Sequence, residues 1–351
     1  MLLKSDRWWS WKIPPMLAFG YFGLLSSVNL PPMGLVLGQI ALFLIAAIGI
    51  AGFGHLFTDI FDIEEDRRRG HTNLWADSGS WQRLLILASL IAASWLPWLF
   101  IPIGRIGLVL LGAEFLMFVL YAVPPIRLKN RGLAGIAADG MYAHALPALW
   151  TWLPFANLAG AKTSFWVGLA IGVWGISVGI RELMHHQAID ADRDREAGAT
   201  TFGVRRGRAH LMKLLRQIVL PVEVISLAVM LAAMTLASML PILGFGLYML
   251  WSFVKVRAFW LEPVRLFPPD SDDAATILAR RILGPFYYGW LPLLLLAELV
   301  IRDRSYLFVA LLHFVLFGPM ILSLLQREAG FLMALFNRPR RRVFIEPMHN
   351  P

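Results

Sequence analysis

Two acidic segments of the chain share one pattern of residue types and spacing. The first runs from Asp62 to Thr72 and the second from Asp190 to Thr200, and both fit D-x-x-x-D-R-x-x-G-x-T. On a helix, carboxylates four residues apart lie on one face, with Cβ atoms about 5–6 Å apart. Asp59, three residues before Asp62, joins the first face. Such paired carboxylates could hold a metal ion.

The composition predicts a protein that crosses a membrane several times. Of 351 residues, 58% are hydrophobic and 16% are charged, against roughly 25% charged in soluble domains. Residues 13–54, 84–104, 163–180 and 305–326 carry no Asp, Glu, Lys or Arg. About 20 apolar residues cross the hydrocarbon core, whereas buried helices of soluble proteins rarely run so long or so often. Lys4, Arg7 and Lys12 precede a first run that is long enough to be a retained helix rather than a cleaved signal.

We expect ten spans and a definite orientation. The spans lie near residues 13–30, 36–58, 84–104, 106–123, 135–156, 163–183, 214–234, 238–254, 284–301 and 305–326. With the N-terminus in the cytosol, 28 of the 32 Lys and Arg residues fall on the cytosolic side. This asymmetry is the positive-inside pattern, and it explains the net charge of +9 without a nucleic-acid partner. Both termini are expected in the cytosol, with the basic tail at anionic lipid of the plasma membrane.

The two acidic segments follow spans 2 and 6, so they point toward the same side of the membrane. The four-span offset predicts a parallel repeat about an axis along the membrane normal. A short similarity between the segments Pro125–Leu128 and Pro263–Leu266 fits the same period. We expect one membrane domain with a first half at 13–156, a second half at 163–301, and an extra helix with a basic tail at 302–351.

The chemistry expected of the aspartates is magnesium-assisted phosphate binding. Like charges repel, and a helix C-terminus disfavours anions by roughly 0.3–1 kcal/mol each, but a divalent cation reverses both effects. The chain has no cysteine, and carboxylate oxygens select a hard ion such as Mg²⁺, which is usually completed by substrate phosphates. Nearby cations would take the remaining charge: Arg67, Arg127, Lys129 and Arg195. A diphosphate in a lipidic cavity points to an isoprenyl substrate.

Other interpretations of the aspartates are weaker. If these charged residues served only to orient the protein in the membrane, they would be Lys and Arg, because Asp contributes little to orientation. A cation channel or transporter would place acids through the membrane rather than at one side of it.

Several buried polar residues could accept a proton from an acceptor substrate. The candidates are Glu114, Asp139, His144 and Glu223, since ionisable residues inside a membrane usually have a function. Asp139 is expected nearest the rim, because it closely follows the loop at 124–132. His185 and His186 are expected to be structural or to lie beside the diphosphate. Solvent exposure is expected for Glu64, Glu65 and Asp192.

Three segments together resemble the UbiA superfamily of intramembrane prenyltransferases. The stretch Thr58–Asp66 resembles the N-D-x-x-D-x-x-x-D signature, and Asp190–Thr201 is similar to the second D-x-x-x-D motif. The stretch Tyr121–Gly132, YAVPPIRLKNRG, is similar to the Y-S-x-P-P-x-R-L-K loop. The resemblance covers roughly residues 13–300. Thr58 replaces the usual Asn, so a hydroxyl stands where the family has an amide donor.

The resemblance implies an all-α transmembrane bundle of about nine spans around a central cavity open to the cytosolic side and to lipid. It implies Mg²⁺ and diphosphate at Asp59, Asp62, Asp66, Asp190 and Asp194. Arg127 and Lys129 would contact the diphosphate, with Thr58 beside it, and Tyr121 would lie near the reacting carbon.

The sequence therefore predicts transfer of an isoprenyl group from a prenyl diphosphate to an aromatic, quinone-precursor or other small acceptor. A terpene cyclase that uses the same magnesium site without an acceptor is the main alternative. Transfer to a phosphosugar, a cation transporter and a lipid-binding scaffold stay open as further alternatives.

Overall fold

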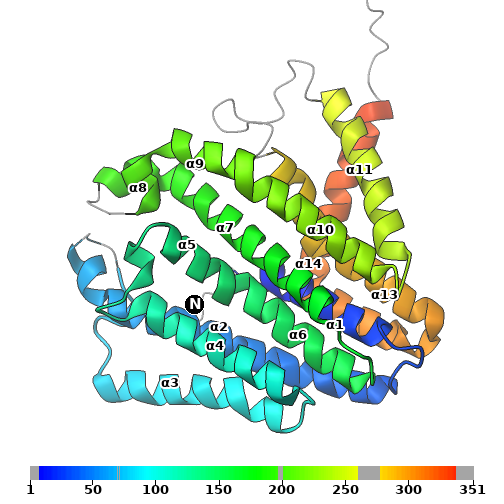
Figure 1. Cartoon of the computed structure of the whole chain (residues 1–351), viewed down its shortest axis with the longest axis horizontal. Coiled ribbons are helices and arrows are strands. Elements are labelled where there is room, and N and C mark those ends of the chain that lie inside the picture. The colour runs from blue at the N-terminus through cyan, green and yellow to red at the C-terminus, as the bar shows by residue number, and fades with distance from the viewer. Residues whose placement is uncertain (1–7, 69, 71, 197–200, 260–276, 337–351) are drawn as a thin grey trace, which may run out of the picture.

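Helices make up most of the described part of the chain. The computed structural model describes residues 8–68, 70, 72–196, 201–259 and 277–336, and within them there is no strand. The predicted all-α bundle is confirmed. Figure 1 shows most of the helices packed side by side along the long axis of the molecule.

Five helical stretches lie between residues 9 and 158. They are α1 (Trp9–Leu25), α2 (Met33–Arg68), α3 (Ser80–Trp95) with the 3₁₀ turn η2 (Leu96–Leu99), α4 (Gly104–Ala122), and a stretch made of α5 (Leu133–Gly140), the π-helical η4 (Met141–Ala145) and α6 (Leu146–Leu158). A short 3₁₀ turn, η3 (Leu128–Asn130), lies in the loop before α5.

Five more helical stretches lie in the described part of residues 165–336. They are α7 (Phe165–Glu196); α8 (Phe202–Arg206) followed by α9 (Arg208–Leu214), η5 (Leu215–Val219) and α10 (Leu220–Met234); α11 (Leu240–Phe259); η6 (Ile277–Leu283), η7 (Phe286–Trp290) and α13 (Leu291–Arg302); and η8 (Arg304–Tyr306) with α14 (Leu307–Phe336).

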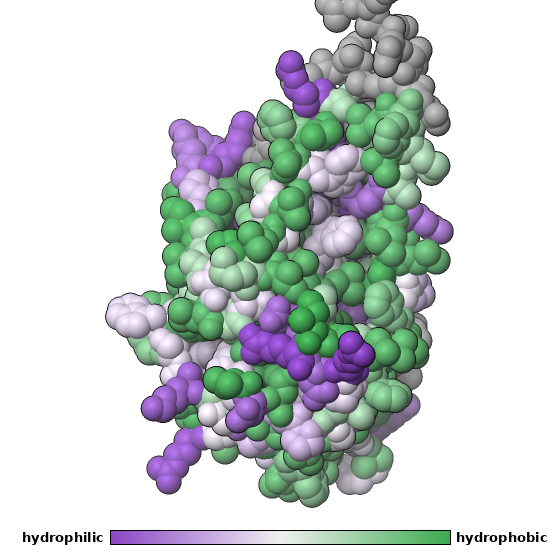
Figure 2. Space-filling view, turned by 90° about the vertical axis from the view of Figure 1, so that its right-hand side faces the viewer, coloured by the Kyte–Doolittle hydropathy of each residue, from purple (hydrophilic) through white to green (hydrophobic). Residues whose placement is uncertain are grey.

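Length and apolar character make this a membrane protein. Eight helical segments of the described chain are long and apolar enough to cross a bilayer. The other two predicted spans are also helical, as the 17-residue α1 and the continuous stretch α5–η4–α6. Figure 2 shows hydrophobic side chains over most of one face, interrupted near its middle by a cluster of hydrophilic ones. This surface suits lipid contact rather than water.

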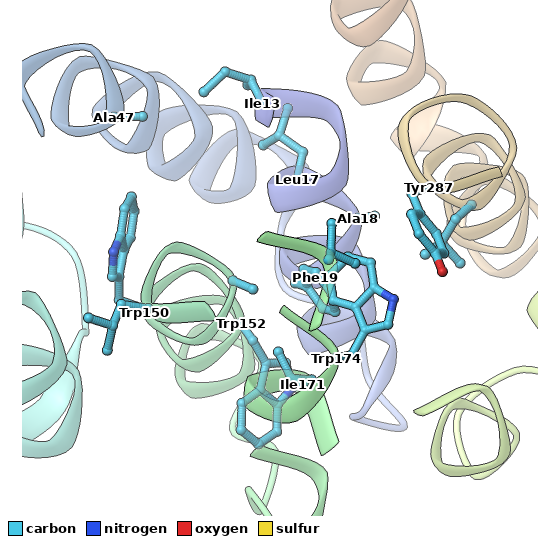
Figure 3. Close-up of a cluster of buried hydrophobic side chains, with 14 of the residues drawn as sticks. Ile13, Leu17, Ala18, Phe19, Ala47, Trp150, Trp152, Ile171, Trp174 and Tyr287 are labelled. Carbon is cyan, nitrogen blue, oxygen red and sulfur yellow. The ribbon is translucent and has the colours of Figure 1, made fainter. Parts of the chain in front are cut away.

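Helix α1 packs deep in the bundle. Its glycines allow close contact, because a Cβ on Gly23 would come within 2.7 Å of the Trp152 carbonyl of α6. Phe19 of α1 meets Trp174 of α7 at 5.2 Å between ring centroids, and Trp174 meets Tyr287 of η7 at 4.9 Å. Figure 3 shows these rings together, with α1 between α6, α7 and η7.

The tenth helical stretch belongs to the bundle. Helix α14 packs against α1, α2 and α13. The Trp9 Nε1 donates to the Leu316 carbonyl at 3.4 Å, and the Tyr21 hydroxyl lies 3.1 Å from His313 Nδ1. The extra helix that the sequence predicts after residue 301 therefore packs on the bundle.

Two helices run further than predicted. Helix α2 continues ten residues beyond the expected end at 58, and α7 continues from 183 to Glu196. Both helices therefore carry their acidic motifs on the helix itself. Figure 1 shows the C-terminal ends of α2 and α7 and the start of α5 at the same end of the bundle.

Candidate active site

The last turns of α2 hold the first aspartate cluster, Asp59, Asp62 and Asp66. The spacing of three and four residues puts these side chains on one helix face. The Asp62 side chain is only 19% exposed, so this carboxylate is turned away from bulk water. A carboxylate that is so shielded needs a positive partner.

Two cations of the loop between α4 and α5 supply that partner. Arg127 Nη2 lies 2.9 Å from Asp62 Oδ1 and 2.7 Å from Glu65 Oε2. Lys129 Nζ donates to the same Asp62 oxygen and lies 3.1 Å from Glu65 Oε2. The expectation that Glu65 faces solvent is wrong, because its side chain is 19% exposed and shares both cations.

The loop backbone aims these cations at α2. Arg127 has a left-handed φ of 39°, and Gly132 ends the loop with a φ of 60°. Gly135 lets α5 begin against the loop, because a Cβ there would lie 2.4 Å from the Leu128 carbonyl. Arg131 Nη2 donates to the Pro125 carbonyl at 2.9 Å. The loop is therefore held by its own contacts.

Asn73 orients the end of the first cluster. Its Nδ2 donates at 2.8 Å to Asp66 Oδ2 and at 2.8 Å to the Asp59 carbonyl. Its Oδ1 accepts from the Trp75 N–H at 3.0 Å. Sequence reasoning missed this residue, because the signal is a fold-back of the chain after α2. In the sequence, Asn73 is distinguished only by its position directly after Thr72, the last residue of the first acidic segment.

Helix α7 presents the second motif with a shielded first aspartate. The Asp190 side chain is 16% exposed, and His186 Nδ1 lies 3.4 Å from its Oδ2. Asp192 points outward, since its side chain is 91% exposed and it pairs with Arg195 at 2.8 Å. Asp194 lies on α7, but its side chain is outside the described part of the chain.

Close packing brings α5 and η4 against α7. A Cβ on Gly179 would lie 2.4 Å from Gly140 Cα, and one on Gly175 would lie 2.7 Å from Ala145 Cα. Small residues allow such backbone approach between membrane helices. The π-helical turn η4 begins directly after Gly140, and π-turns are frequent at functional sites. Asp139, Tyr142 and His144 are thereby held next to the second motif.

A row of polar groups joins the two motifs. The Tyr142 hydroxyl donates to Asp139 Oδ1 at 2.5 Å, and the Tyr121 and Tyr142 rings are 5.2 Å apart. Tyr121 lies within electrostatic range of both Asp62 and Asp139. Asp139 in turn lies within range of His186, the neighbour of Asp190. Phe118 packs on Tyr142 at 4.9 Å, so an aromatic wall accompanies this row.

A cavity lies beside the row. It has a volume of about 730 Å³ and is lined by α1, α5, η4, α6, α7, η6, η7 and α14. Asp139, His144, His185 and His186 all line it. This volume falls in the range of small-molecule sites.

The other predicted candidates lie apart from the row. Arg67 is exposed and pairs with Glu64 at 2.6 Å. The Thr58 hydroxyl donates to the Gly54 carbonyl of its own helix at 2.8 Å. Glu114 accepts from Trp150 Nε1, and Glu223 accepts from Tyr287 at 2.8 Å. Both of these buried carboxylates already have donors.

The oxygen ligands at this site suit a hard cation whose coordination shell is completed by oxygens of the substrate. The carboxylates Asp59, Asp62, Asp66 and Asp190 offer only oxygen ligands, which is the preference of Mg²⁺. Within the described residues, no three acidic or histidine side chains are grouped to hold an ion by themselves. Mg²⁺ often uses one or two carboxylates plus phosphate oxygens. The residues therefore fit magnesium that arrives with a diphosphate.

Comparison of the sequence with models of protein families shows how this chain is related to known proteins. The model of the UbiA prenyltransferase family matches residues 14–282. The chain belongs to this family. No functionally curated protein matches the sequence.

Solved structures agree on the UbiA fold. A UbiA homolog from Archaeoglobus fulgidus bound to GPP and Mg²⁺ superimposes with a TM-score of 0.53 at 16% identity, covering 84% of this chain and 97% of that one. The same homolog bound to DMAPP and Mg²⁺ gives a TM-score of 0.50 at 13% identity, covering 91% and 97%. At such identities the likeness shows the fold alone.

The UbiA match leaves part of this chain unaccounted for. It ends at Ile282, so α13 and α14 lie outside the matched segment. Thr58 stands where the UbiA signature has Asn, and its hydroxyl is used within α2. A side-chain amide is nevertheless present at the first aspartate cluster, because Asn73 donates a hydrogen bond to Asp66.

Proposed function

We propose that this protein transfers an isoprenyl group from a prenyl diphosphate to a small acceptor, with Mg²⁺ as cofactor. The observation that carries the proposal is the row from Asp62 through Tyr121, Tyr142 and Asp139 to His186 and Asp190. It joins two shielded aspartates at one end of a membrane bundle. Family membership supports the same reaction class.

The diphosphate would bind between the motifs. Asp59, Asp62, Asp66, Asp190 and Asp194 would hold Mg²⁺, which when bound neutralises the charge of the departing diphosphate. Arg127 and Lys129 already gather at Asp62 and Glu65. A diphosphate carries more charge than two carboxylates, so these cations would turn to it. Arg67, Arg195 and Thr58 would reach the diphosphate only after leaving their present partners.

The chain's own residues would assist ionisation. The allylic C–O bond breaks, and the electron pair leaves with the diphosphate toward Arg127 and Lys129. The allylic cation that remains needs a dry site with aromatic faces. Tyr121, Tyr142 and Phe118 form such a wall beside the cluster. Fixed charges that are in place before reaction need no reorganisation.

The acceptor would complete the reaction at Asp139. Its nucleophilic atom forms the new bond to the allylic carbon, and its proton passes to the Asp139 carboxylate. The Tyr142 hydroxyl holds that carboxylate at 2.5 Å. Asp139 lines the cavity, so an acceptor there would have access to it.

We further propose that both termini lie in the cytosol and that the membrane is the plasma membrane. The positive-inside count supports the orientation, since 28 of 32 basic residues fall on one side of the predicted spans.

One experiment tests the reaction class. The purified protein is incubated with geranylgeranyl diphosphate and Mg²⁺, first without an acceptor and then with a set of phenolic and lipid acceptors. A prenylated acceptor and a donor that is stable alone support transfer. A cyclic hydrocarbon without an acceptor would instead identify a terpene cyclase. No donor consumption under any condition would refute both.

A further inference from the structure

The helices α8 and α9 and the turn η5 carry a surface of one charge sign. No Asp or Glu occurs between residues 201 and 222, whereas five Lys and Arg side chains in this segment are exposed. Figure 1 shows α8 and α9 at the end of the bundle where α5 begins and α7 ends. We call these five residues the basic surface: Arg205, Arg206, Arg208, Lys213 and Arg216.

The inner side of these helices is fixed to the bundle. Phe202 and Leu211 are buried, with 8% and 0% of their area exposed. The Gly203 N–H donates to Gln187 Oε1 of α7 at 3.0 Å, and a Cβ on Gly203 would lie 2.7 Å from the Gln187 carbonyl. Close packing on α7 therefore holds the backbone of α8, so that its exposed arginines start from a fixed position.

The described part of the protein supplies little counter-charge to the basic surface. Among the described residues, no carboxylate forms an ion pair with Arg205, Arg206 or Lys213. A cluster of about four to eight Lys and Arg beside a membrane span is a typical binding surface for anionic lipid headgroups. The basic surface has this size and this place, which favours a negatively charged partner at the edge of the bilayer.

The helix that carries most of the basic surface continues into a membrane span. The segment Arg208–Met234 is helical without a break and is apolar enough to cross a bilayer. From residue 218 to residue 234, every exposed side chain is apolar. Ile218, Val222, Ile225 and Val229 recur at intervals of three and four residues and so share one helix face. The exposed surface therefore changes from cationic to apolar along the helix, in the order of the headgroup and acyl chains of a phospholipid.

We propose that the basic surface binds anionic phospholipids of the bilayer around the bundle. Their headgroups pair with Arg205, Arg206 and Lys213, because guanidinium and ammonium groups form charge-assisted hydrogen bonds with phosphate oxygens. Their acyl chains lie along the apolar face that begins at Ile218. None of the five cations lines the cavity beside Asp139, so this site does not depend on the proposed transferase function.

Binding of a charged and an uncharged lipid to the full chain tests the proposal. The detergent-purified, delipidated protein, without donor or Mg²⁺, is titrated with dioleoylphosphatidylglycerol and with dioleoylphosphatidylcholine, which have the same acyl chains. Phosphatidylglycerol should bind at least about fivefold more tightly, since each Lys or Arg at an anionic surface contributes about that factor. It should also raise the unfolding temperature more, because tighter binding to the native state stabilises that state more. Equal binding of the two lipids overturns the proposal.

Charge-matched variants assign the binding to the basic surface. Arg205→Gln combined with Arg206→Gln should weaken phosphatidylglycerol binding about fivefold or more and leave phosphatidylcholine binding unchanged. Arg205→Lys combined with Arg206→Lys keeps the charge and should retain most of the affinity. The control, Arg68→Gln combined with Arg257→Gln, removes the same charge from exposed arginines at the ends of α2 and α11 and should keep the preference. Equal losses in the two Gln pairs would show an effect of total charge, which overturns the assignment.

Competition separates a phospholipid site from a site for phosphate alone. Inorganic phosphate in large molar excess should not displace phosphatidylglycerol, because it has no acyl chains to lie on the apolar face of α10. Full displacement by inorganic phosphate would mean that the arginines bind any phosphate, and would overturn the phospholipid as the partner.

Discussion

The Arg127 guanidinium lies 2.9 Å from the Asp62 carboxylate and 2.7 Å from that of Glu65. A cation from the loop before α5 thus bridges two carboxylates one turn apart on α2. Lys129 bridges the same pair. The two cations expected to hold a diphosphate are thus gathered at these two carboxylates.

Glu65 therefore competes with the donor for two cations. Glu65→Gln should tighten binding of geranylgeranyl diphosphate two- to fivefold, because partly exposed ion pairs contribute up to about 1 kcal/mol. Titration with Mg²⁺ present measures this. Glu64→Gln is the matched control, since Glu64 is exposed and pairs only with Arg67 in the described contacts. Weaker donor binding in Glu65→Gln would make Glu65 a site residue instead.

Lys129→Ala should mainly raise the donor Kd, by about ten- to a hundredfold. A charge-assisted hydrogen bond to the diphosphate contributes about 1.5–3 kcal/mol. Arg67→Ala, which removes an exposed cation on α2, should have a much smaller effect. Comparable losses in the two variants would mean that Arg67 turns to the diphosphate.

Asp62→Ala and Asp190→Ala should each reduce turnover below about 1% while the protein stays folded. Groups that stabilise developing charge contribute about 10²–10³ in rate. Asp192→Ala is the control, because Asp192 lies on the same helix with 91% exposure. Steady-state rates and thermal unfolding in detergent measure both properties. Full activity of either first variant would refute the metal assignment.

Asn73→Ala should increase the Mg²⁺ concentration needed for half-maximal rate by about 10–100-fold. Residues that orient a metal-binding carboxylate have effects of this size, and Asn73 holds Asp66 at 2.8 Å. Asn157→Ala, which removes an exposed amide bonded to the Pro102 carbonyl, should leave the requirement unchanged. An unaltered requirement in Asn73→Ala would leave Asn73 with a purely structural role.

Glu223→Ala should destabilise the bundle by about 3–5 kcal/mol, because it leaves the buried Arg181 without its main partner. Glu223 is 0% exposed and joins α10 to α7 and η7 through Arg181 and Tyr287. Glu64→Ala, which removes a member of an exposed pair with Arg67, should cost less than about 1 kcal/mol. Unfolding monitored by circular dichroism compares the two. A small effect for Glu223→Ala would show that Glu182 and water compensate Arg181.

The sequence predicted those features of the structure that depend on the local pattern of residues. The length of the apolar runs predicted the helical stretches, and the spacing of the aspartates predicted that Asp62 and Asp66 share one helix face. It could not predict Asn73, because that contact depends on how the chain folds back after α2. It could not separate Glu65 from Glu64 either, since the loop that covers one of them is set by Arg127 and Gly132. The parallel four-span repeat and the division into halves stay predictions.

The cavity beside Asp139 shows the same limit. Lys12, Arg280 and Arg327 lie far apart in the sequence, and positive-inside counting treats each as a topology signal. Only the packing of α1, η6 and α14 brings them to one cavity.

The most direct measurement is an experimental structure with Mn²⁺ and the uncleavable analogue geranylgeranyl thiolodiphosphate. Anomalous scattering locates the metal without assumptions about its ligands. We predict manganese bound by carboxylates of both α2 and α7, with the thiolodiphosphate between them and in contact with Arg127 and Lys129. Metal and thiolodiphosphate bound elsewhere, or held by only one of the two helices, would contradict the account.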